Sequence, residues 1–525
     1  MGQDYRSNLA RLLGLQERGL FQGNKIGLEK ESLRVNTDGK MARTCHPIAL
    51  GSALTHPYIT TDYSEALAEF ITPPLATVRQ ALAFLCEIQR FVYQQLDNEI
   101  LWATSMPCVV EGDTSIPIAY YGESNAGKMK HIYRRGIGSR YGYSMQVIAG
   151  VHFNYSFPLD LWSHLKELDQ SHLETIPYLS NRYIMLTRNL QRFGWIVPYL
   201  FGASPAVCKS FVGSRSTFLS DFDKNTYFGP YATSLRMGDI GYQNRKEAET
   251  GIKVCYDSLD AYIGSLECAI STPSPEWAKI GVKVDGEYRQ LNANILQIEN
   301  EYYSSVRLKQ VLRKNERPTA ALRKRGVQYL EVRSLDVNAF DPLGVNESQL
   351  RFLEALLIYC LVKDSPVFGE QDKKDIDKNM IDVAHEGRRP GLLLKKNNQS
   401  ISLKDWASEI CHELEPICEY LDRSEDNKPY SYSLEFQQQL VENPERTPSA
   451  RMLTEMRTTG ETFFAFAKRM SLQHEKYFRS AVIAEDRLHQ FQQLAKQSIV
   501  DQKAIEESDK ISYEEYMANY FSSGI

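Results

Sequence analysis

The sequence predicts an α+β fold in which an antiparallel sheet presents one polar face and helices support the other. Stretches near residues 27–34, 146–158 and 328–335 alternate polar and apolar side chains, as half-buried strands do. After about residue 345, apolar residues recur at helical spacing instead. No linker or internal repeat separates the two parts. We therefore expect residues 1–525 to form one unit, with a sheet core over about 20–345 and a mainly helical part over about 346–525.

The composition is that of an ordinary globular protein: 42% of the 525 residues are hydrophobic and 24% are charged. The formal net charge of −5 and the pI of about 6.1 give no reason to expect nucleic-acid binding. The longest apolar runs, residues 353–362 and 194–208, are too short to span a bilayer or are broken by Pro198. We expect no membrane association.

Location is predicted from the N-terminus and the cysteines. Residues 1–6 contain no apolar signal core, and Arg6 stands where a myristoylation signal requires Ser or Thr. The nine cysteines are scattered and odd in number, which fits reduced thiols better than a disulfide framework. The sequence therefore predicts a cytoplasmic protein.

The first helices and strands are predicted from the spacing of apolar residues and from turn-forming and proline residues. Residues 4–21 have the leucine spacing of an amphipathic helix, and Asn36–Gly39 forms a turn that closes the following strand. Asp62 is expected in a loop and Glu69 in a short strand, which ends at a proline pair. Residues 77–97 form a second amphipathic helix.

Two carboxylates in the first strand define the candidate site. In a strand Glu29 and Glu31 face the same side, whereas in a helix they would point about 200° apart. Burying two like charges side by side is costly, and a divalent cation is the usual way to keep both ionised. The alternative is an edge strand whose glutamates face water.

A basic stretch at residues 128–142 is punctuated by glycines. Its spacing does not match a dinucleotide-binding fingerprint, and it precedes a strand instead of following one. Two interpretations stay open: a flexible basic loop that could approach phosphate, or a solvated run of charges.

The clearest strand covers residues 146–158. Its odd-numbered positions are apolar, while Gln146, His152 and Asn154 share the other face. One face then packs on a core, and the other lines water or a ligand cavity. The sequence leaves open whether His152 is functional or an ordinary satisfied histidine.

Two later stretches also carry polar side chains that suit a site. Arg236 and Tyr242 lie in an expected loop, a combination that holds carboxylates. Residues 289–303 alternate again, which would place Glu299, Glu301 and Tyr303 on one side of a strand.

The strand at residues 328–335 resembles the first strand, because two charged side chains again lie two positions apart on one face. Glu331 and Arg333 share a face, so the carboxylate can hold a cation while the guanidinium holds the oxygens of a transferring phosphoryl group. A cross-strand ion pair is the alternative interpretation.

The helical part is expected at about 346–363, 404–421, 432–441 and 460–500, with no strand of comparable quality. Cys411 and Cys418 fall on one apolar stripe, which predicts burial.

Collected on the polar faces, these residues predict a site for phosphoryl transfer. Five carboxylates and one histidine without a cysteine favour Mg²⁺ or Mn²⁺ over zinc. Such cations with arginines indicate ATP as the phosphoryl donor. Because no Walker A motif occurs, a P-loop enzyme is excluded. The candidate metal-binding residues are Glu29, Glu31, Asp62, Glu69, His152 and Glu331, with Arg236 and Arg333 beside them.

Seven ordered segments closely resemble the proteobacterial glutamate–cysteine ligases, also called γ-glutamylcysteine synthetases. They are Gly27–Arg34 (GLEKESLR), Ser52–Thr72, Gly150–Ser156 (GVHFNYS), Arg192–Pro205, Tyr231–Tyr242 (YATSLRMGDIGY), Leu296–Tyr303 (LQIENEYY) and Tyr329–Val337 (YLEVRSLDV). The resemblance is dense over about residues 10–345 and thinner in the helical part, where Glu386–Leu394 matches.

The resemblance implies a curved antiparallel sheet shaped as a glutamine-synthetase-like funnel. It implies a ligase that uses ATP to join L-glutamate to L-cysteine through γ-glutamyl phosphate, the first step of glutathione synthesis. Glutathione is the expected feedback inhibitor, and a monomer is expected.

The resemblance also implies residue roles. The six candidate metal-binding positions match those that hold Mg²⁺ or its shell in the family, Glu331 among them. Arg333 matches the residue beside the transferring phosphoryl group. Four residues match the family positions that line the amino-acid pockets: Tyr133, Arg236, Tyr242 and Tyr303.

Several rivals share these features. A carboxylate–amine ligase with another acceptor, or a guanidino phosphotransferase, would have a similar metal site and differ only in the tyrosine pocket. A non-catalytic protein with a degenerate site is a rival of another class, but the candidate ligand set is complete. An RNA-binding role for residues 128–142 is disfavoured by the net charge and by the absence of an RNA-binding motif of stacking aromatics.

Overall fold

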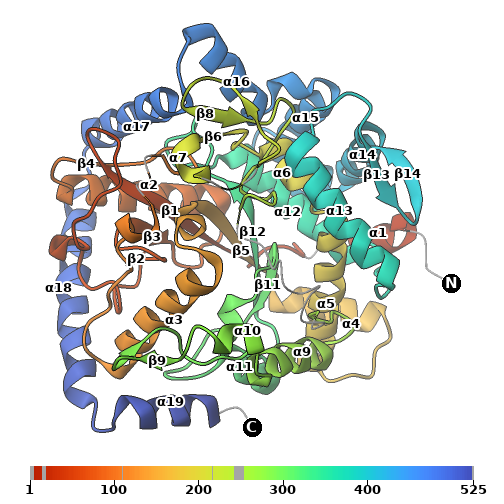
Figure 1. Ribbon diagram of the computed structural model, residues 1–525. Coiled ribbons are helices and arrows are strands. Elements are labelled where there is room, and N and C mark those ends of the chain that lie inside the picture. The colour runs from red at the N-terminus through yellow and green to blue at the C-terminus, as the bar shows by residue number, and fades with distance from the viewer. Residues whose placement is uncertain are drawn as a thin grey trace.

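A computed structural model of the chain (Figure 1) describes residues 5–14, 19–108, 110, 112–213, 215, 217–241 and 253–522. Within them, seven strands form one sheet in which every pairing is antiparallel, in the order β11-β12-β5-β1-β3-β2, with β4 also paired to β1. In chain order these strands are β1 (Lys25–Asn36), β2 (Ile59–Thr61), β3 (Leu67–Ile71), β4 (Glu99–Leu101), β5 (Gly150–Ser156), β11 (Val306–Lys309) and β12 (Tyr329–Asp336).

The back of the sheet is its apolar face. Leu28 of β1 and Val332 of β12 both pair with Phe153 of β5, and all three side chains are buried. Antiparallel partners share a face, so this apolar row lies opposite the polar one. The sheet therefore packs one face on the core, as its alternation predicts.

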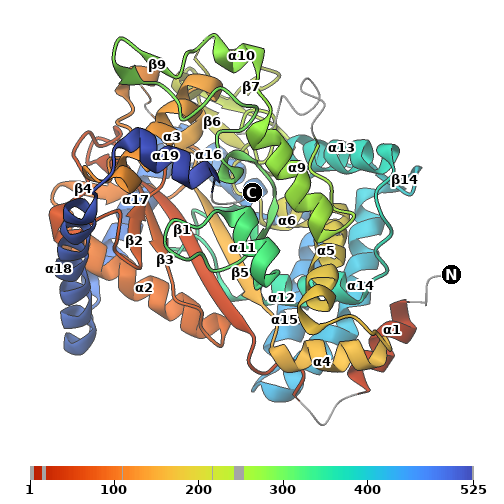
Figure 2. The ribbon, with the colours of Figure 1, turned by 90° about the horizontal axis from the view of Figure 1, so that it is seen from below.

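Helices from both halves of the chain cover the back (Figure 2). Helix α2 packs on β1, α5 on β11 and α6 on β12, and α12 crosses behind α2 and α5. Helix α12 begins with a capping box at Asn346 and is buried along almost its whole length. The helices of this layer and those beyond it are α1 (Tyr5–Leu13), α2 (Val78–Gln95), α4 (Leu159–Leu168), α5 (Thr175–Phe193), α6 (Ile196–Phe201), α7 (Lys209–Val212), α12 (Glu347–Val362), α13 (Glu370–Glu386), α14 (Leu403–Leu421), α15 (Pro429–Glu442), α16 (Pro448–Thr459) and α17 (Phe463–Ser480).

A second group of helices lies over the polar face. It comprises α3 (Asn125–Tyr141), α9 (Leu259–Ser271), α10 (Pro275–Ala278), α11 (Pro318–Arg325) and α19 (Tyr513–Ser522). Helix α18 (Glu485–Ser508) runs down the outside from α2 and leads into α19, which lies beside α3 in both views (Figures 1 and 2). The polar face is thus partly covered, with α3 and α19 contributing side chains that face it.

Several expected elements are confirmed. The strands that carry Glu29, His152 and Glu331 form as predicted, Glu69 lies in β3, and α2 matches the second predicted helix. Cys411 and Cys418 are both buried in α14. The α+β class is correct. No helix among the described residues is both long and apolar enough to cross a membrane.

The prediction of a flexible loop at residues 128–142 is wrong, because nearly all of these residues form helix α3. Its glycines serve close packing and not flexibility. A Cβ atom added at Gly136 would lie 2.1 Å from Oε1 of Gln297, and one at Gly138 would lie 2.2 Å from the hydroxyl of Tyr63. Only a residue without a side chain lets the helix approach this closely.

Other boundaries also differ from the prediction. Helix α1 ends at Leu13, short of the expected residue 21. The strand expected over residues 289–303 is absent from this described segment, where Glu299–Glu301 instead forms a 3₁₀ turn. The helix expected over residues 460–500 is two helices, α17 and α18. Three small sheets lie outside the main one: β6 (Ala206–Cys208), β7 (Ser220–Asp221) and β8 (Thr226–Phe228); β9 (Lys283–Val284) and β10 (Glu287–Tyr288); β13 (Leu393–Lys396) and β14 (Gln399–Ser402).

The expectation of nine reduced cysteines is also wrong at two positions. Cys108 and Cys208 form a disulfide, with their Cα atoms 5.5 Å apart, a separation typical of disulfides. The two residues are 100 positions apart, so no local spacing could predict the pair. The other seven cysteines are free.

Candidate active site

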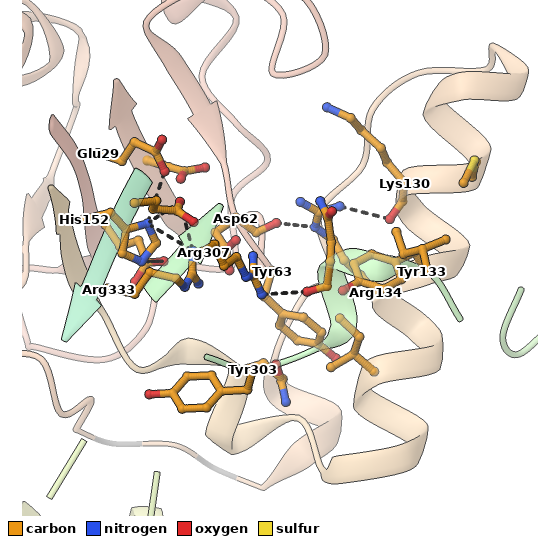
Figure 3. A pocket seen from close by; sticks show the side chains of 18 of the residues that line it. Glu29, Asp62, Tyr63, Lys130, Tyr133, Arg134, His152, Tyr303, Arg307 and Arg333 are labelled. Carbon is orange, nitrogen blue, oxygen red and sulfur yellow. Dashed lines mark hydrogen bonds and ion pairs between the residues drawn. The ribbon is translucent and has the colours of Figure 1, made fainter. Parts of the chain in front are cut away.

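The polar face of the sheet lines a cavity of about 530 Å³ (Figure 3). It collects all the described residues that were predicted to bind metal ions, the phosphoryl group or the amino acids. Tyr242 lies outside the described residues. The predicted residues that line the cavity are Glu29, Glu31, Asp62, Glu69, Tyr133, His152, Arg236, Tyr303, Glu331 and Arg333.

Strand register brings the acidic side chains together. Glu29 of β1 lies directly opposite His152 of β5, and Glu31 of β1 lies opposite Glu69 of β3. Glu331 of β12 pairs with Asn154, two positions along β5 from His152. Direct partners and diagonal neighbours on one face of a sheet are within side-chain reach. The carboxylates of the three strands β1, β3 and β12 therefore lie close to one another.

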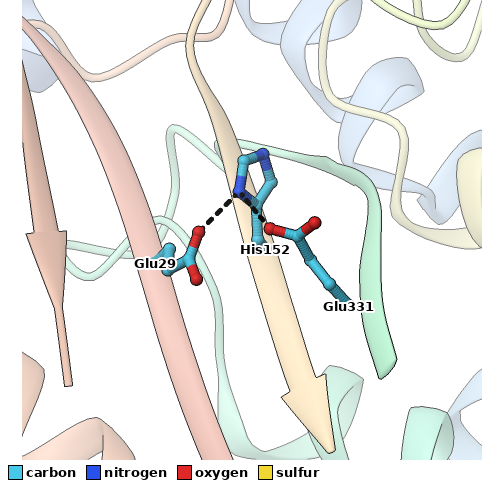
Figure 4. Close-up of side chains that lie close together, drawn as sticks. All are labelled: Glu29, His152 and Glu331. Atoms are coloured by element: carbon cyan, nitrogen blue, oxygen red, sulfur yellow. Dashed lines mark hydrogen bonds and ion pairs between the residues drawn. The ribbon is translucent and has the colours of Figure 1, made fainter. Parts of the chain in front are cut away.

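The first cluster is formed by Glu29, His152 and Glu331, which point toward one another (Figure 4). Nδ1 of His152 lies 3.1 Å from Oε2 of Glu29 and 3.6 Å from Oε1 of Glu331. The amide of Asn154 donates a hydrogen bond of 2.8 Å to the other oxygen of Glu29. The side chain of Glu29 is thus fixed from both sides.

The second cluster is formed by Glu31, Glu69 and again His152, whose ligand atoms lie within 4.8 Å of one another. Nε2 of His152 lies 3.7 Å from Oε1 of Glu31, and the backbone N–H of Gly150 donates to Oε2 of the same carboxylate at 2.6 Å. The one imidazole therefore stands between two groups of carboxylates. Asp62, which follows β2, also lines the cavity.

The pKa values of these acids diverge because their neighbours differ. Burial raises the pKa of Glu69 well above its ordinary value, and the charges of Glu29, Asp62 and Glu31 raise it further. Burial likewise raises the pKa of Glu31.

Two other acids of the site show the opposite net shift. Burial acts to raise the pKa of Glu331, but the charges of Lys309 and Arg333 outweigh it and hold that pKa well below the ordinary value. Burial and the charge of Glu331 act to raise the pKa of Glu29, yet the hydrogen bond with His152 and the charge of Lys309 leave it lowered.

The donor set fits hard divalent cations. Most of the donors are carboxylate oxygens, with a single imidazole and no thiolate, which suits Mg²⁺ or Mn²⁺. Among the described residues, no hydrogen bond reaches Nε2 of His152 or Oε2 of Glu331, although both atoms are buried. Buried polar atoms without partners are uncommon in proteins, and these two lie inside the acidic clusters.

Basic residues lie against the same clusters. Nη1 of Arg333 lies 3.1 Å from Oε1 of Glu331 and 3.4 Å from Nδ1 of His152. Nζ of Lys309 lies 3.6 Å from the same oxygen of Glu331, and Arg307 is the direct strand partner of Glu331. The cavity thus holds cationic groups that suit phosphate beside acidic groups that suit metal ions.

Helix α3 forms the opposite wall with Lys130, Tyr133 and Arg134 (Figure 3). The Arg134 guanidinium donates from Nε to the backbone carbonyl of Asp62 and stacks over the ring of Tyr121, with Cζ 4.6 Å from the ring centre. This helix therefore presents fixed charge across the cavity from the acidic clusters.

Arg236 and Tyr303 lie together at another side of the cavity. The Arg236 guanidinium donates to the carbonyl of Arg333 at 2.8 Å and lies 3.8 Å from the Asp336 carboxylate. A Cβ atom at Gly150 would lie 2.1 Å from Nη2 of Arg236, so the guanidinium packs directly against the backbone of this glycine. The Tyr303 hydroxyl contacts the sulfur of Met237 at 3.4 Å.

Glu299 and Glu301, expected near Tyr303 on one strand face, do not line the cavity. They are buried against arginines instead: Glu299 bonds Arg317 at 3.0 Å and Glu301 bonds Arg140 at 2.7 Å. The 3₁₀ turn at these residues rotates neighbouring side chains away from a common face. These two acids support the loop and not the site.

Sequence reasoning missed Arg307 and Lys309. They alternate with buried Val306 and Leu308, a signal only four residues long. It also missed Lys130 and Arg134, because that stretch was expected to be a loop. Tyr516 and Tyr520 of α19 line the cavity from the far end of the chain, and no local pattern connects them to it.

Comparisons with known proteins identify the relatives of this chain. Residues 9–383 match the family model described as glutamate-cysteine ligase. Glutamate–cysteine ligase from Alcanivorax borkumensis is 46% identical over 97% of this chain and 98% of its own length. The enzyme from Pseudomonas paraeruginosa is 48% identical over 95% of this chain and 94% of its own.

Solved structures agree. The crystal structure of glutamate–cysteine ligase from Francisella tularensis in complex with AMP superposes with a TM-score of 0.89 at 37% identity, covering 95% of this chain and 98% of that one. A bifunctional glutathione synthetase from Pasteurella multocida shares the fold, with a TM-score of 0.73 at 24% identity over 94% of this chain and 58% of that chain.

Proposed function

The chain belongs to the glutamate–cysteine ligase family, and from that membership we propose a role for each group of residues in its cavity. Its reaction uses ATP to join the γ-carboxylate of L-glutamate to the amine of L-cysteine. The products are γ-glutamylcysteine, ADP and phosphate, and the reaction is the first step of glutathione biosynthesis. The observation that carries the residue roles is the convergence of Glu29, His152 and Glu331 beside Arg333.

The acidic clusters are the proposed metal sites. Mg²⁺ or Mn²⁺ would be held by Glu29, Glu31, Asp62, Glu69, His152 and Glu331. When bound, the cations neutralise the ATP phosphates and the glutamate carboxylate, two anions that otherwise repel each other. Nε2 of His152, which has no hydrogen bond to any described residue, and the raised pKa of Glu69 support this role, because both leave unmet interactions in a buried site.

Arg333 and Glu331 are the proposed catalytic residues. The γ-carboxylate oxygen of glutamate attacks the γ-phosphorus of ATP, and the bond to the bridging oxygen of ADP breaks. Arg333 faces this transfer with a planar guanidinium, which suits phosphoryl oxygens, and Glu331 fixes its orientation through the 3.1 Å contact.

The second step consumes γ-glutamyl phosphate. The cysteine amine attacks the acyl carbon, phosphate leaves with the electrons of the C–O bond, and the nitrogen loses a proton. Water must be excluded while the acyl phosphate exists, and the aromatic rings of Tyr63, Tyr133 and Tyr303 in the cavity wall suit this need.

Amino-acid recognition is assigned to Tyr133, Arg236, Tyr242 and Tyr303. A guanidinium binds a substrate carboxylate, and the tyrosine rings line the cysteine pocket. Arg236 and Tyr303 lie close enough together to form one such pocket, since both contact Met237.

Further properties complete the proposal. Residues 1–525 act as one catalytic unit, because the sheet and the helical part share a continuous core. Glutathione acts as a feedback inhibitor, and the protein works as a cytoplasmic monomer.

The test is release of phosphate from ATP in the presence of Mg²⁺, measured with glutamate alone and then with glutamate and cysteine. We expect strong release only with both amino acids, together with γ-glutamylcysteine as the product. Release with glutamate that ignores cysteine would indicate another amine acceptor. Absence of release under all conditions would indicate a degenerate binding protein.

A further inference from the structure

The loop at residues 230–239 carries Arg236 into the cavity wall, and the sheet holds its second half. Oγ of Ser234 donates a hydrogen bond of 2.9 Å to the Asp336 carboxylate at the end of β12. The Arg236 guanidinium lies 3.8 Å from the same carboxylate. The first half of the loop is held by a different part of the molecule.

The C-terminal end of helix α13 holds this first half. The last carbonyl groups of a helix have no partner inside it. In α13 the carbonyl of Ala384 accepts hydrogen bonds from the backbone N–H groups of Thr233 and Ser234, at 2.9 and 3.1 Å. The hydroxyl of Thr233 donates to the carbonyl of Val383 at 2.9 Å. A Cβ atom added at Gly387 would lie 2.8 Å from Cγ2 of Thr233, so the helix end and the loop are in close contact.

Arg388, just beyond this helix end, binds the backbone of the same loop. Its guanidinium donates to the carbonyl of Pro230 at 2.7 Å and to that of Ala232 at 3.4 Å, and its backbone N–H donates to the carbonyl of Tyr231 at 3.2 Å. One residue therefore holds three successive carbonyl groups. The Arg388 side chain is only 2% exposed and does not line the cavity, so it can influence a bound substrate only through the loop.

We propose that Arg388 is a positioning residue for the ligase reaction, which fixes the loop so that Arg236 meets the carboxylate of an amino-acid substrate. The inference rests on the proposed function, because it takes Arg236 as the group that binds this carboxylate. Two parallel hydrogen bonds between a guanidinium and a carboxylate require both distance and alignment, and a displacement of about 1 Å is enough to lose them. This role gives a function to Glu386–Leu394, the segment of the helical part that resembles the family.

The experiment compares Arg388→Met with the unmodified chain by steady-state kinetics. Methionine keeps an apolar stem but donates no hydrogen bond, so the carbonyl groups of Pro230 and Ala232 lose their partner. We expect KM for the amino acid that Arg236 binds to rise about ten-fold or more, while KM for ATP stays the same. Arg236→Lys identifies that amino acid, because it keeps the charge, loses the planar fork and should raise the same KM.

A residue that merely stabilised the fold would give a different result. Its loss would lower the unfolding temperature and the active fraction of the protein, and it would leave the KM values for ATP and both amino acids unchanged. That outcome for Arg388→Met would overturn the proposal.

Two matched controls separate the bonds to the loop from charge near the helix end. Arg389→Met changes the next residue, which is 48% exposed and pairs with Glu386 at the surface. Glu445→Gln removes the carboxylate that lies 3.0 Å from Arg388 and is itself 62% exposed. Exposed ion pairs contribute little, so both variants should keep all KM values. If either raised the amino-acid KM as much as Arg388→Met, the proposal would be wrong.

Arg388→Lys serves if the methionine variant does not fold. Its ammonium keeps the charge but cannot bond two carbonyl groups as the planar fork does, so the same KM should rise by a smaller factor. If Arg236→Lys raised the KM of neither amino acid, the role of Arg236 in the proposed function would be wrong, and that of Arg388 with it. If Arg236→Lys raised one KM and the Arg388 variants raised none, only the positioning role would be refuted.

Discussion

Buried acids occur in two settings in this protein, and the settings differ in how the charge is balanced. In the loop beside the sheet, Glu301 and Arg140 form an ion pair of 2.7 Å with no exposed side-chain surface on either partner. Glu301 also accepts hydrogen bonds from the Tyr141 hydroxyl and the backbone N–H of Gln297. In the cavity, Glu29, Glu31 and Glu69 gather around one imidazole instead, and the nearby cations are shared among several acids.

The difference separates support from function. An acid that only stabilises a fold is buried with its own cation and a full set of hydrogen bonds, because an unpaired charge is costly. Around Glu69 like charges dominate: burial and the charges of Glu29, Asp62 and Glu31 raise its pKa more than the charge of Arg134 lowers it. An arrangement that is unfavourable without a ligand is expected where a cationic ligand binds.

The largest effects should come from neutralising one acid of each kind. Glu69→Gln removes a carboxylate that like charges disfavour, so the metal-free protein should unfold at the same temperature or a higher one. Its rate of γ-glutamylcysteine formation should fall by at least about 100-fold, because a proposed metal ligand is lost.

Glu301→Gln should behave in the opposite way. It leaves Arg140 buried without a negative partner, which should lower the free energy of unfolding by about 3 kcal/mol. Denaturant unfolding in the absence of metal checks both variants. If Glu69→Gln were the more destabilising of the two, the contrast between the settings would be refuted.

Arg333→Lys tests whether the cationic side of the cavity acts in the transition state. Lysine keeps the charge but loses the planar fork, so kcat should fall about 100-fold and KM for ATP should change far less. Steady-state kinetics measure both constants. A change in KM alone would show that Arg333 serves only ATP binding.

Arg351→Lys is the control for that variant. Arg351 is a buried arginine in α12 that bonds Glu347 at 2.9 Å, away from the cavity. Its replacement should lower stability modestly and leave kcat as it is.

Much of the cavity could be predicted because strand alternation is local. A period of two residues places Glu29 with Glu31 and Glu331 with Arg333 whatever the rest of the fold does. Strand order and register then brought His152 between them, and no single stretch contains that information.

The failures have physical causes as well. The glycines of α3 resembled a flexible loop, but they allow contacts with Gln297 and Tyr63 that lie far away in sequence. The alternation at residues 289–303 was overridden by ion pairs to Arg140 and Arg317, which also come from distant segments. Local patterns predicted side-chain direction within a strand, and long-range packing decided where strands and helices formed.

Addition of Mg²⁺ or Mn²⁺ without nucleotide should stabilise the protein, since the cation binds only the folded cavity. At 100 times the dissociation constant the expected gain is about 2.7 kcal/mol. Thermal unfolding against metal concentration measures it. Glu301→Gln should keep the full increment, whereas a Glu29→Gln/Glu69→Gln double variant should lose most of it; an equal increment in both variants would place the cation elsewhere.

A third buried acid, Glu354 of α12, tests the same contrast through pH. Burial raises its pKa to about 7, although the Tyr430 hydroxyl and the Asn24 amide hydrogen-bond its oxygens. Between about pH 4.5 and 7 the unfolded chain loses this proton while the folded chain keeps it, so this group makes stability fall as pH rises, by at most about 1.4 kcal/mol per unit.

Glu354→Gln carries no such proton and keeps a similar shape. Relative to the unmodified chain it should therefore gain stability steadily across that window, as urea unfolding at several pH values would show, without loss of activity at pH 7. A constant difference between the two chains across the window would mean that the neighbours of Glu354 offset the cost of its burial and that its pKa is not raised.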